Sequence, residues 1–434
     1  MRWCGVCLLG ILGWQLAIGP AFAEEPQTLT LKAAREMALR NHPKISQANL
    51  EAQASKQVIT QVRAGLLPTL TFDATAVGTA DDNTRIAAGS LNNPAIYERF
   101  AQGVTVSQLL LDFGHTSNLL GSSKLSSKAE DSNAEATKDQ ILLDVDVAFY
   151  AALKAQSILA VARQTLDTRK VLLEQVDALA RNKLKSDLDL SFATVAYEEA
   201  KLLVAKSEND VEAAFTALST LLGDREQHEY RLVEEPMPDA QPVDSSVLVD
   251  TALSKRPDLA SLRFERDAAM RYAKAERALI FPVITAFGSG GIIPVRDNNQ
   301  FDASYAAAGV NLSLPIFDGW LNSAKYSEAD LRAQAAAEKL RDAENSAARD
   351  VQTASLNATY AFERLDLTQQ LFDNANHAYE LADLRYKLGS SSIVELSQAQ
   401  LNKTEAEIAH TSAKYDYQIQ RAILEYQIGE STAE

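Results

Sequence analysis

Residue types that commonly catalyse reactions or hold metal ions are few in this chain of 434 residues, and they are widely separated. The sequence has no nucleophile elbow, no phosphate-binding glycine loop and no pair of histidines at zinc-ligand spacing. No acid or thiol set accompanies any of the five histidines in a metal-binding pattern; they are His42, His115, His228, His377 and His410. The sequence therefore predicts no metal site, no cofactor and no enzymatic activity.

Two acidic residues are of more interest because they stand at equivalent places in similar segments. Leu188-Asp189-Leu190 is followed by Ala193, and Val394-Glu395-Leu396 is followed by Ala399. Carboxylates gathered around one axis would concentrate cations and repel anions. The alternative is that each acid is an ordinary helix-start residue, favoured by the helix dipole just after a turn. Which of these two roles the acids have depends on the helices and turns in which they lie.

The N-terminus has the pattern of an export signal. Met1-Arg2 precedes an apolar run over residues 6–18, and Ala21-Phe22-Ala23 forms a small-residue cleavage site before Glu24. We predict a signal peptide over residues 1–23. The apolar run is shorter than the roughly 20 residues that a membrane helix needs, so membrane insertion would depend on strands.

Composition excludes several further classes of protein. Both cysteines, Cys4 and Cys7, lie in the signal, so the mature chain is predicted to lack disulfides and thiolate metal sites. The formal charge of -16 argues against a nucleic-acid surface and favours cations over anions as guests.

An internal repeat organises the mature chain. The copies span residues 24–223 and 255–429, and a short tail follows over 430–434. A Pro-containing connector over 224–254 links the copies and is expected to lie across the middle of the molecule, as an equatorial segment. The matching anchors are Asn41-His42-Pro43 with Lys255-Arg256-Pro257, Leu66-Leu67-Pro68 with Ile280-Phe281-Pro282, Leu111-Asp112-Phe113-Gly114 with Ile316-Phe317-Asp318-Gly319, and Leu221-Leu222-Gly223 with Gln427-Ile428-Gly429.

Each copy ends in a long segment almost free of helix breakers. Glycine is absent from residues 122–222, and Gly389 is the only glycine in residues 320–428. Small and apolar residues recur every seven positions, such as Val145, Ala152 and Leu159, which predicts coiled coils with closely spaced helices. Polar breaks over residues 181–187 and 387–392 predict hairpin tips. The arm over residues 115–181 would be about 100 Å long, and the short helix after Pro43 would extend the shorter return arm.

Each copy also carries two segments with strand periodicity, over residues 69–78 and 100–110 in the first and 283–290 and 302–314 in the second. A loop is expected to begin at Pro294 between the last two. Four strands are too few to close a barrel, and an open edge in lipid leaves backbone groups unpaired. Chains must therefore pool their strands.

These anchors, in this order, resemble the TolC-like outer membrane factor family. The resemblance covers nearly all of the mature chain and includes residues 388–396, Leu-Gly-Ser-Ser-Ser-Ile-Val-Glu-Leu. It implies an α+β membrane protein: a homotrimer whose twelve-stranded β-barrel, four strands per chain, continues into a long α-helical coiled-coil tunnel. It also implies an outer-membrane location, a helical body in the periplasm, and docking to a periplasmic adaptor protein and an inner-membrane transporter.

The resemblance also assigns the tips. Asp189 and Glu395 are similar to the family's acidic gate residues, and Tyr386 to a tyrosine that bonds across the closed entrance. A gate arginine of the family is replaced by Ser391 and a second acidic position by Gln398, which predicts a less acidic and more weakly locked constriction. Adaptor docking is expected at the tips, at Leu184, Ser186, Leu388, Gly389, Ser390 and Ser391.

Other interpretations remain open from the sequence. Tyr386 continues the coiled-coil pattern and is equally suited to core packing, and the tip residues also suit simple turns. A barrel-anchored coiled-coil structural or adhesive surface protein would also use long helices, but it predicts a C-terminal barrel. A helical periplasmic binding protein predicts a monomer. The cargo class, whether drugs, metal cations or polypeptides, is not encoded in any of these features.

Overall fold

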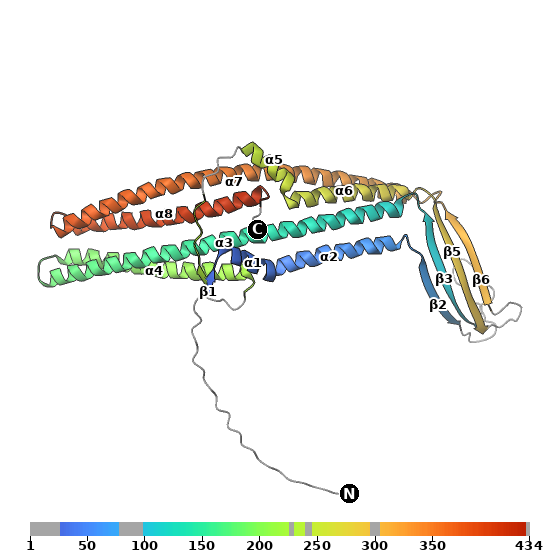
Figure 1. Cartoon of the computed structure of the whole chain (residues 1–434), viewed down its shortest axis with the longest axis horizontal. Helices are drawn as coiled ribbons and strands as arrows, with labels where there is room; N and C mark the ends of the chain where they lie inside the picture. The colour runs from blue at the N-terminus through green and yellow to red at the C-terminus, as the bar shows by residue number, and fades with distance from the viewer. Residues whose placement is uncertain (1–26, 78–98, 225–229, 239–244, 296–303, 431–434) are drawn as a thin grey trace, which may run out of the picture.

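The computed structural model describes residues 27–77, 99–224, 230–238, 245–295 and 304–430. The predicted signal peptide lies outside these residues. Within them the chain is elongated, with a β-sheet at one end and two helical hairpins running away from it (Figure 1).

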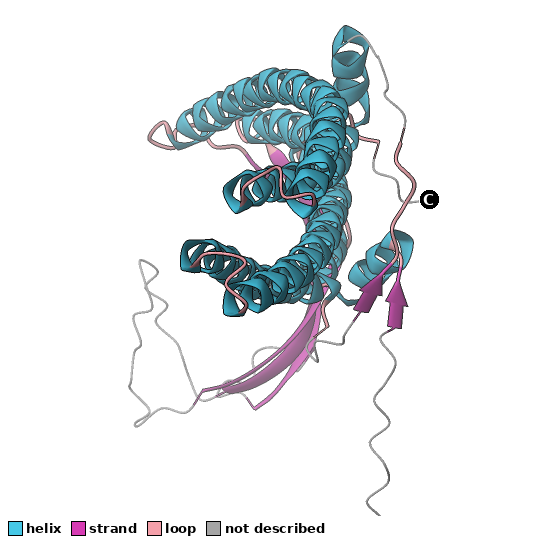
Figure 2. Cartoon of the chain, turned by 90° about the vertical axis from the view of Figure 1, so that its left-hand side faces the viewer, coloured by secondary structure: helices cyan, strands magenta, loops and turns pink. Residues whose placement is uncertain are grey.

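Six helices form the body. The hairpins consist of α3 (His115–Arg181) with α4 (Asp187–Leu222) and α7 (Leu321–Lys387) with α8 (Ile393–Gln427). Nearer the sheet, α2 (Pro43–Ala64) packs on α3, and α6 (Pro257–Ala278) packs between α3 and α7. The helices therefore lie side by side in one curved layer, which appears as an open arc when viewed along its length (Figure 2).

Alanine is the most frequent buried residue type on the four long helices. Larger side chains such as Val145 and Phe149 are fully buried as well, but alanines fill 16 of the 42 buried positions, among them Ala152, Ala162 and Ala354. A methyl side chain allows two helix backbones to approach closely, which suits a thin sheath better than a thick core. One stretch of α3 is long and apolar enough to cross a membrane, but half of it is buried against neighbouring helices, so packing accounts for its composition.

Two glycines join the short helices to the return arms. Gly223 ends α4 with φ 72° and lies against Asn41 before α2, and Gly429 follows α8 with φ 74° and lies against Arg256 before α6. Each left-handed residue reverses the chain at a helix C-terminus, as glycine does most readily. The repeat is thus visible as two equivalent joints halfway along the body.

The sheet is antiparallel, in the order β2-β3-β5-β6. Its strands are β2 (Thr69–Val77), β3 (Arg99–Leu111), β5 (Val283–Val295) and β6 (Ser304–Ser313). The two copies meet where β3 pairs with β5, for instance Thr105 with Ser289. Within the described residues, one edge of β2 and one edge of β6 have no strand partner.

The expectation that a loop begins at Pro294 is wrong. β5 runs on to Val295 because pairing with β3 continues beyond Gly291. The register shifts between the pairs Gln102–Ile292 and Phe100–Val295, so Pro294 falls in an irregularity where its missing N–H costs no ladder bond.

Four small elements around the middle of the body were not predicted. They are β1 (Gln27–Leu29) and β4 (Tyr230–Leu232), which pair in parallel, and the helices α1 (Leu31–Asn41) and α5 (Ser245–Lys255). β4 and nearly all of α5 belong to the segment over 224–254, which was predicted to be a connector across the middle of the body, without secondary structure being assigned to it. They lie on the convex side of the arc (Figure 2).

The two kinds of left-handed glycine allow a matched test of the joint. A β-carbon at Gly223 would lie 2.9 Å from the carbonyl oxygen of Asn41, whereas one at Gly389, φ 75°, would meet no described atom within 4 Å. Gly389→Ala should cost only the left-handed backbone strain of about 1–2 kcal/mol. We expect Gly223→Ala to lower the thermal unfolding midpoint by clearly more than Gly389→Ala does. The midpoint is measured by circular dichroism in detergent. Equal shifts would show that the joint is not closely packed.

Candidate functional site

The two hairpin tips lie together at the end opposite the sheet (Figures 1 and 2). The chain reverses over residues 182–186 between α3 and α4, and over residues 388–392 between α7 and α8. The candidate site residues from the sequence are therefore all brought to one end of the molecule.

The first tip is closed by a capping box at the start of α4. The hydroxyl of Ser186 accepts the backbone N–H of Asp189 at 3.1 Å, and a carboxylate oxygen of Asp189 accepts the N–H of Ser186 at 3.1 Å and its hydroxyl at 2.8 Å. These hydrogen bonds from Ser186 lower the pKa of Asp189. Asp189 thus has a structural role that keeps it ionised, and Leu184 projects into solvent beside it with 70% exposure.

The second tip has the same outline but different contacts. Ser392 accepts the N–H of Glu395 at 3.3 Å, yet the Glu395 carboxylate pairs with Arg385 at 2.8 Å. Gly389 takes the left-handed conformation, and the N–H of Ser390 donates to the carbonyl of Arg385 at 2.9 Å. Leu388 is 73% exposed, like Leu184 on the first tip.

A small apolar cluster joins the two tips. Buried side chains from both hairpins form it: Leu172, Val176, Ala193, Ala382, Ile393 and Leu396. Tyr386 packs against this cluster, so it does take part in core packing. The ammonium of Lys185, from the first tip, lies 4.5 Å from the centre of the Tyr386 ring, a cation–π distance. The Tyr386 hydroxyl is buried and has no hydrogen-bond partner in the described part of the chain.

Polar contacts continue this junction along α3 and α8 toward the middle of the body. Thr165 and Thr404 are within hydrogen-bond distance at 3.3 Å. Further along, Asp416 on α8 is shared by Lys154 on α3 at 2.8 Å and Arg364 on α7 at 3.0 Å. The second hairpin is therefore tied to the first by the Lys154–Asp416 ion pair at mid-length and by apolar and cation–π contacts at the tip.

Sequence reasoning did not find Arg385 or Lys185. It treated Ser391 as the replacement of a gate arginine, but Ser391 donates only to the carbonyl of Ser392, at 3.3 Å, while Arg385 supplies a guanidinium next to Glu395. The five-residue turn between α7 and α8 could have indicated that Arg385 and Glu395 face each other. The contact of Lys185 crosses between hairpins and has no signal in the sequence.

Three of the four histidines in the described residues have structural surroundings, and the fourth, His377, is exposed. Nδ1 of His42 accepts the N–H of Lys44 and caps α2, while His115 lies 2.9 Å from the carbonyl of Ala275 and His410 stacks on Phe372. Burial, with a smaller contribution from Lys44, lowers the pKa of His42, consistent with a neutral acceptor. No described group of three His, Cys, Asp or Glu residues is arranged to hold a metal ion. His228 lies outside the described residues.

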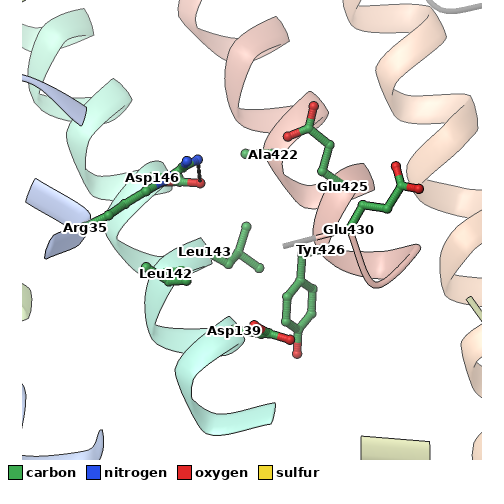
Figure 3. Close-up of a pocket in the computed structure, with 9 residues that line it drawn as sticks. All are labelled: Arg35, Asp139, Leu142, Leu143, Asp146, Ala422, Glu425, Tyr426 and Glu430. Atoms are coloured by element: carbon green, nitrogen blue, oxygen red, sulfur yellow. Dashed lines mark hydrogen bonds and ion pairs between the residues drawn. The ribbon is translucent and has the colours of Figure 1, made fainter. Parts of the chain in front are cut away.

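A second polar group lies at the middle of the body, where α1 docks on α3. Arg35 and Asp146 form a two-pronged ion pair, with both N–O distances 2.7 Å, beside a small pocket that Glu425, Tyr426 and Glu430 also line (Figure 3). Burial of a paired guanidinium and carboxylate fixes α1 in position, because removing either partner strands a buried charge. The ion pair fastens α1 to α3, and the pocket beside it is separate from the tips.

Comparison with known proteins matches one family to both repeats of this chain. The profile of the family described as "Outer membrane efflux protein" matches residues 34–224 and 248–430. Outer membrane protein OprJ of Pseudomonas aeruginosa is 26% identical over 90% of this chain and 81% of its own length. The alkaline protease secretion protein AprF of the same organism is 24% identical over 94% of this chain and 85% of its own length.

A solved structure shares the fold. The CmeC outer membrane channel of Campylobacter jejuni superposes with a TM-score of 0.82, covering 93% of this chain and 87% of that channel at 18% identity. The match includes sheet and helical body together, so the elongated architecture is that of TolC-like channels.

The capping box at the first tip generates a test of its own. Asp189→Ala removes the acceptor that holds Ser186, which should destabilise the first turn of α4 by about 1 kcal/mol and speed amide exchange there about fivefold. The pKa of Asp189 is lower in the folded chain than in the unfolded one. Its contribution is therefore complete above the unfolded value and is lost as pH falls through the folded value.

The matched control is Asp187→Ala, two residues earlier on the same exposed turn. Asp187, like Asp189, is an acid in the first turn and interacts favourably with the helix dipole, but it does not take part in the capping box. Hydrogen exchange measured by mass spectrometry over residues 186–192 should respond more to Asp189→Ala. Equal acceleration in the two variants would reduce Asp189 to a general helix-start acid.

Proposed function

Because this chain belongs to the outer membrane efflux protein family, we propose that three copies form a twelve-stranded barrel and a helical tunnel. In this proposal the assembly is the passive exit duct of a tripartite efflux or type I secretion system, and an inner-membrane pump delivers the cargo through a periplasmic adaptor. The chain is an outer membrane protein, as its relatives are.

The observation that carries the proposal is that the sheet and the helical layer are both unfinished at the same two edges. β2 and α2 lie at one side and β6 and α7 at the other, and the free edges of β2 and β6 expose backbone groups. In hydrocarbon an unpaired N–H or C=O costs several kcal/mol, so a barrel has to close. Pairing β6 of each copy with β2 of the next completes twelve strands.

Exposed apolar stripes on the outer helices support the same closure. On α4 the exposed residues Leu188, Phe192, Val195 and Leu202 follow heptad-like spacing, as do Leu356, Tyr360, Leu367 and Leu371 on α7. Both stripes lie on helices at opposite ends of the row formed by α4, α3, α8 and α7. Stripes of this length on a monomer would expose a large apolar area to water. A neighbouring copy would cover both.

Closure around a threefold axis gathers the tips at the tunnel entrance. Asp189 and Glu395 would then stand around one axis, with Tyr386 at the inner contact of the two hairpins. The acidic groups and the overall charge of -16 favour passage of cations over anions. The exposed leucines Leu184 and Leu388 would present six apolar points for docking of the adaptor.

The cargo follows from the partner rather than from this chain. AprF is named for secretion of a protease, while the family is described by efflux, so one architecture accompanies different cargo.

Docking can be tested with a single cysteine, because the mature chain is predicted to contain none. Ser391→Cys carrying a photo-crosslinker, in cells that retain their outer membrane, should capture a periplasmic adaptor that mass spectrometry identifies. The control is Ser46→Cys on α2, far from the tips. Equal capture of the adaptor at both positions, or none at Ser391, would contradict tip docking.

The contact between Lys185 and Tyr386 should hold the entrance closed. Lys185→Ala removes the cation–π contact between the hairpins, worth roughly 0.5–1 kcal/mol at an exposed site, and should raise the resting conductance in planar bilayers. Lys183→Ala is the control, since this neighbouring tip lysine is exposed, and its left-handed backbone, φ 56°, carries a β-carbon in both the parent and the variant. Unchanged conductance in Lys185→Ala, or the same rise in Lys185→Ala and Lys183→Ala, would show that this contact does not hold the entrance closed.

A further inference from the structure

The two faces of the sheet differ in chemistry, and odd-numbered residues share one of them. In the cross-strand register Thr71 pairs with Thr105, Thr105 with Ser289, and Ser289 with Ala307. The opposite face carries exposed Leu70, Phe72, Val104, Val106, Val310 and Leu312. A membrane barrel places its apolar face toward lipid and its polar face toward the lumen. In the barrel proposed above, the odd-numbered residues therefore line the lumen.

Two aromatic residues, Phe287 and Tyr305, nevertheless point to this polar face, and each lies directly opposite a glycine. Phe287 on β5 pairs with Gly309 on β6, and Tyr305 on β6 pairs with Gly291 on β5, which in turn pairs with Gly103 on β3. An aromatic ring lying across a cross-strand glycine covers backbone that has no side chain of its own.

The distances show that the rings occupy the space of the missing side chains. A β-carbon on Gly309 would lie 2.8 Å from Cζ of Phe287. A β-carbon on Gly103 would lie 2.3 Å from the hydroxyl oxygen of Tyr305, and one on Gly291 would lie 2.6 Å from the same atom. Any larger residue at these glycines would force the ring away from the sheet, toward the centre of the lumen.

We propose that Phe287 and Tyr305 set the bore of the barrel, and that Gly309 and Gly103 are positioning residues that keep the two rings flat against its inner wall. The proposal rests on the trimeric barrel proposed above. Threefold repetition would place three rings in each of two rows, which lie four residues apart along the strands, or about 13 Å. Flat rings leave the lumen wide, whereas a tilted ring in each of three copies would narrow it on three sides at one level.

The size limit for guests would then be decided partly in the barrel and not only at the tips. Phe287 and Tyr305 are 44% and 43% exposed, so each ring presents one side to the lumen while the other covers backbone. In the proposed barrel, the wall thereby offers apolar contact to passing molecules.

The test measures the bore from the sheet end, independently of the tips. Asn311→Cys places a thiol on the lumen face of β6. A reagent that enters the barrel at the end where β6 begins must pass the Tyr305 row and then the Phe287 row to reach this thiol. Intact cells are treated with a small sulfonated maleimide or with a maleimide on a polyethylene glycol chain that still labels the parent thiol measurably. The labelling rates of the two reagents are compared.

Adding Gly309→Ala should slow labelling by the polymer reagent severalfold and leave the small reagent nearly unaffected. Adding Phe287→Ala to that variant should restore the polymer rate, because the displaced ring is removed. Gly103→Ala, with Tyr305→Ala as its rescue, should behave in the same way. Gly291→Ala is not suitable, since its β-carbon would also lie 2.3 Å from the backbone oxygen of Gln102 and would disturb the sheet.

The outcomes separate this inference from the barrel itself. If Asn311→Cys is labelled but Gly309→Ala changes neither rate, or Phe287→Ala fails to rescue, the bore-setting role is overturned while the barrel stands. A cysteine in place of Val310, on the apolar face, is the control for the lumen. Equal labelling of both positions by the sulfonated reagent, or none at Asn311→Cys, would overturn the assignment of the lumen and with it the proposed barrel.

Discussion

An unpaired backbone edge is the constraint from which the rest of this molecule follows. A sheet of four strands has two free edges, and lipid offers no hydrogen-bond partner for the exposed N–H and C=O groups. The pairing of β3 with β5 removes the edges between the repeats but leaves those of β2 and β6. In the proposed trimer, further copies of the same chain complete a closed sheet, and the curved helical layer of one chain is likewise an open arc (Figure 2).

The helical body depends on close packing in the same way. Alanines at many buried positions let the helices form a layer one helix thick, and a single chain forms only an open arc (Figure 2). The ion pair of Arg35 with Asp146 fixes α1 against this layer, because removing either partner would strand a buried charge. The glycine joints at Gly223 and Gly429 let a shorter return arm and a short helix together match the long arm.

The two tips are equivalent in the internal repeat but differ in their contacts. Asp189 and Glu395 occupy equivalent positions, yet one carboxylate closes a capping box and the other pairs with Arg385 across the turn. Opening the first turn of α4 would break the Ser186–Asp189 hydrogen bonds, whereas moving α8 away from α7 at the second tip would break the Arg385–Glu395 ion pair. The hairpins then meet through an apolar cluster and a lysine on a tyrosine ring, contacts that can separate without stranding a buried ion pair.

Local patterns were sufficient for much of this architecture. Missing glycine and proline, heptad spacing and alternating polarity depend on residues near in sequence, so they located the long helices, the tips and four strands, and the resemblance to TolC-like channels is confirmed by the family profile. The extension of β5 past Pro294, the contact of Lys185 with Tyr386, and the packing of Phe287 and Tyr305 on glycines were decided by tertiary structure alone. Each depends on the register between segments far apart in the chain, and a sequence pattern fixes which face a residue occupies but not which residue lies opposite it.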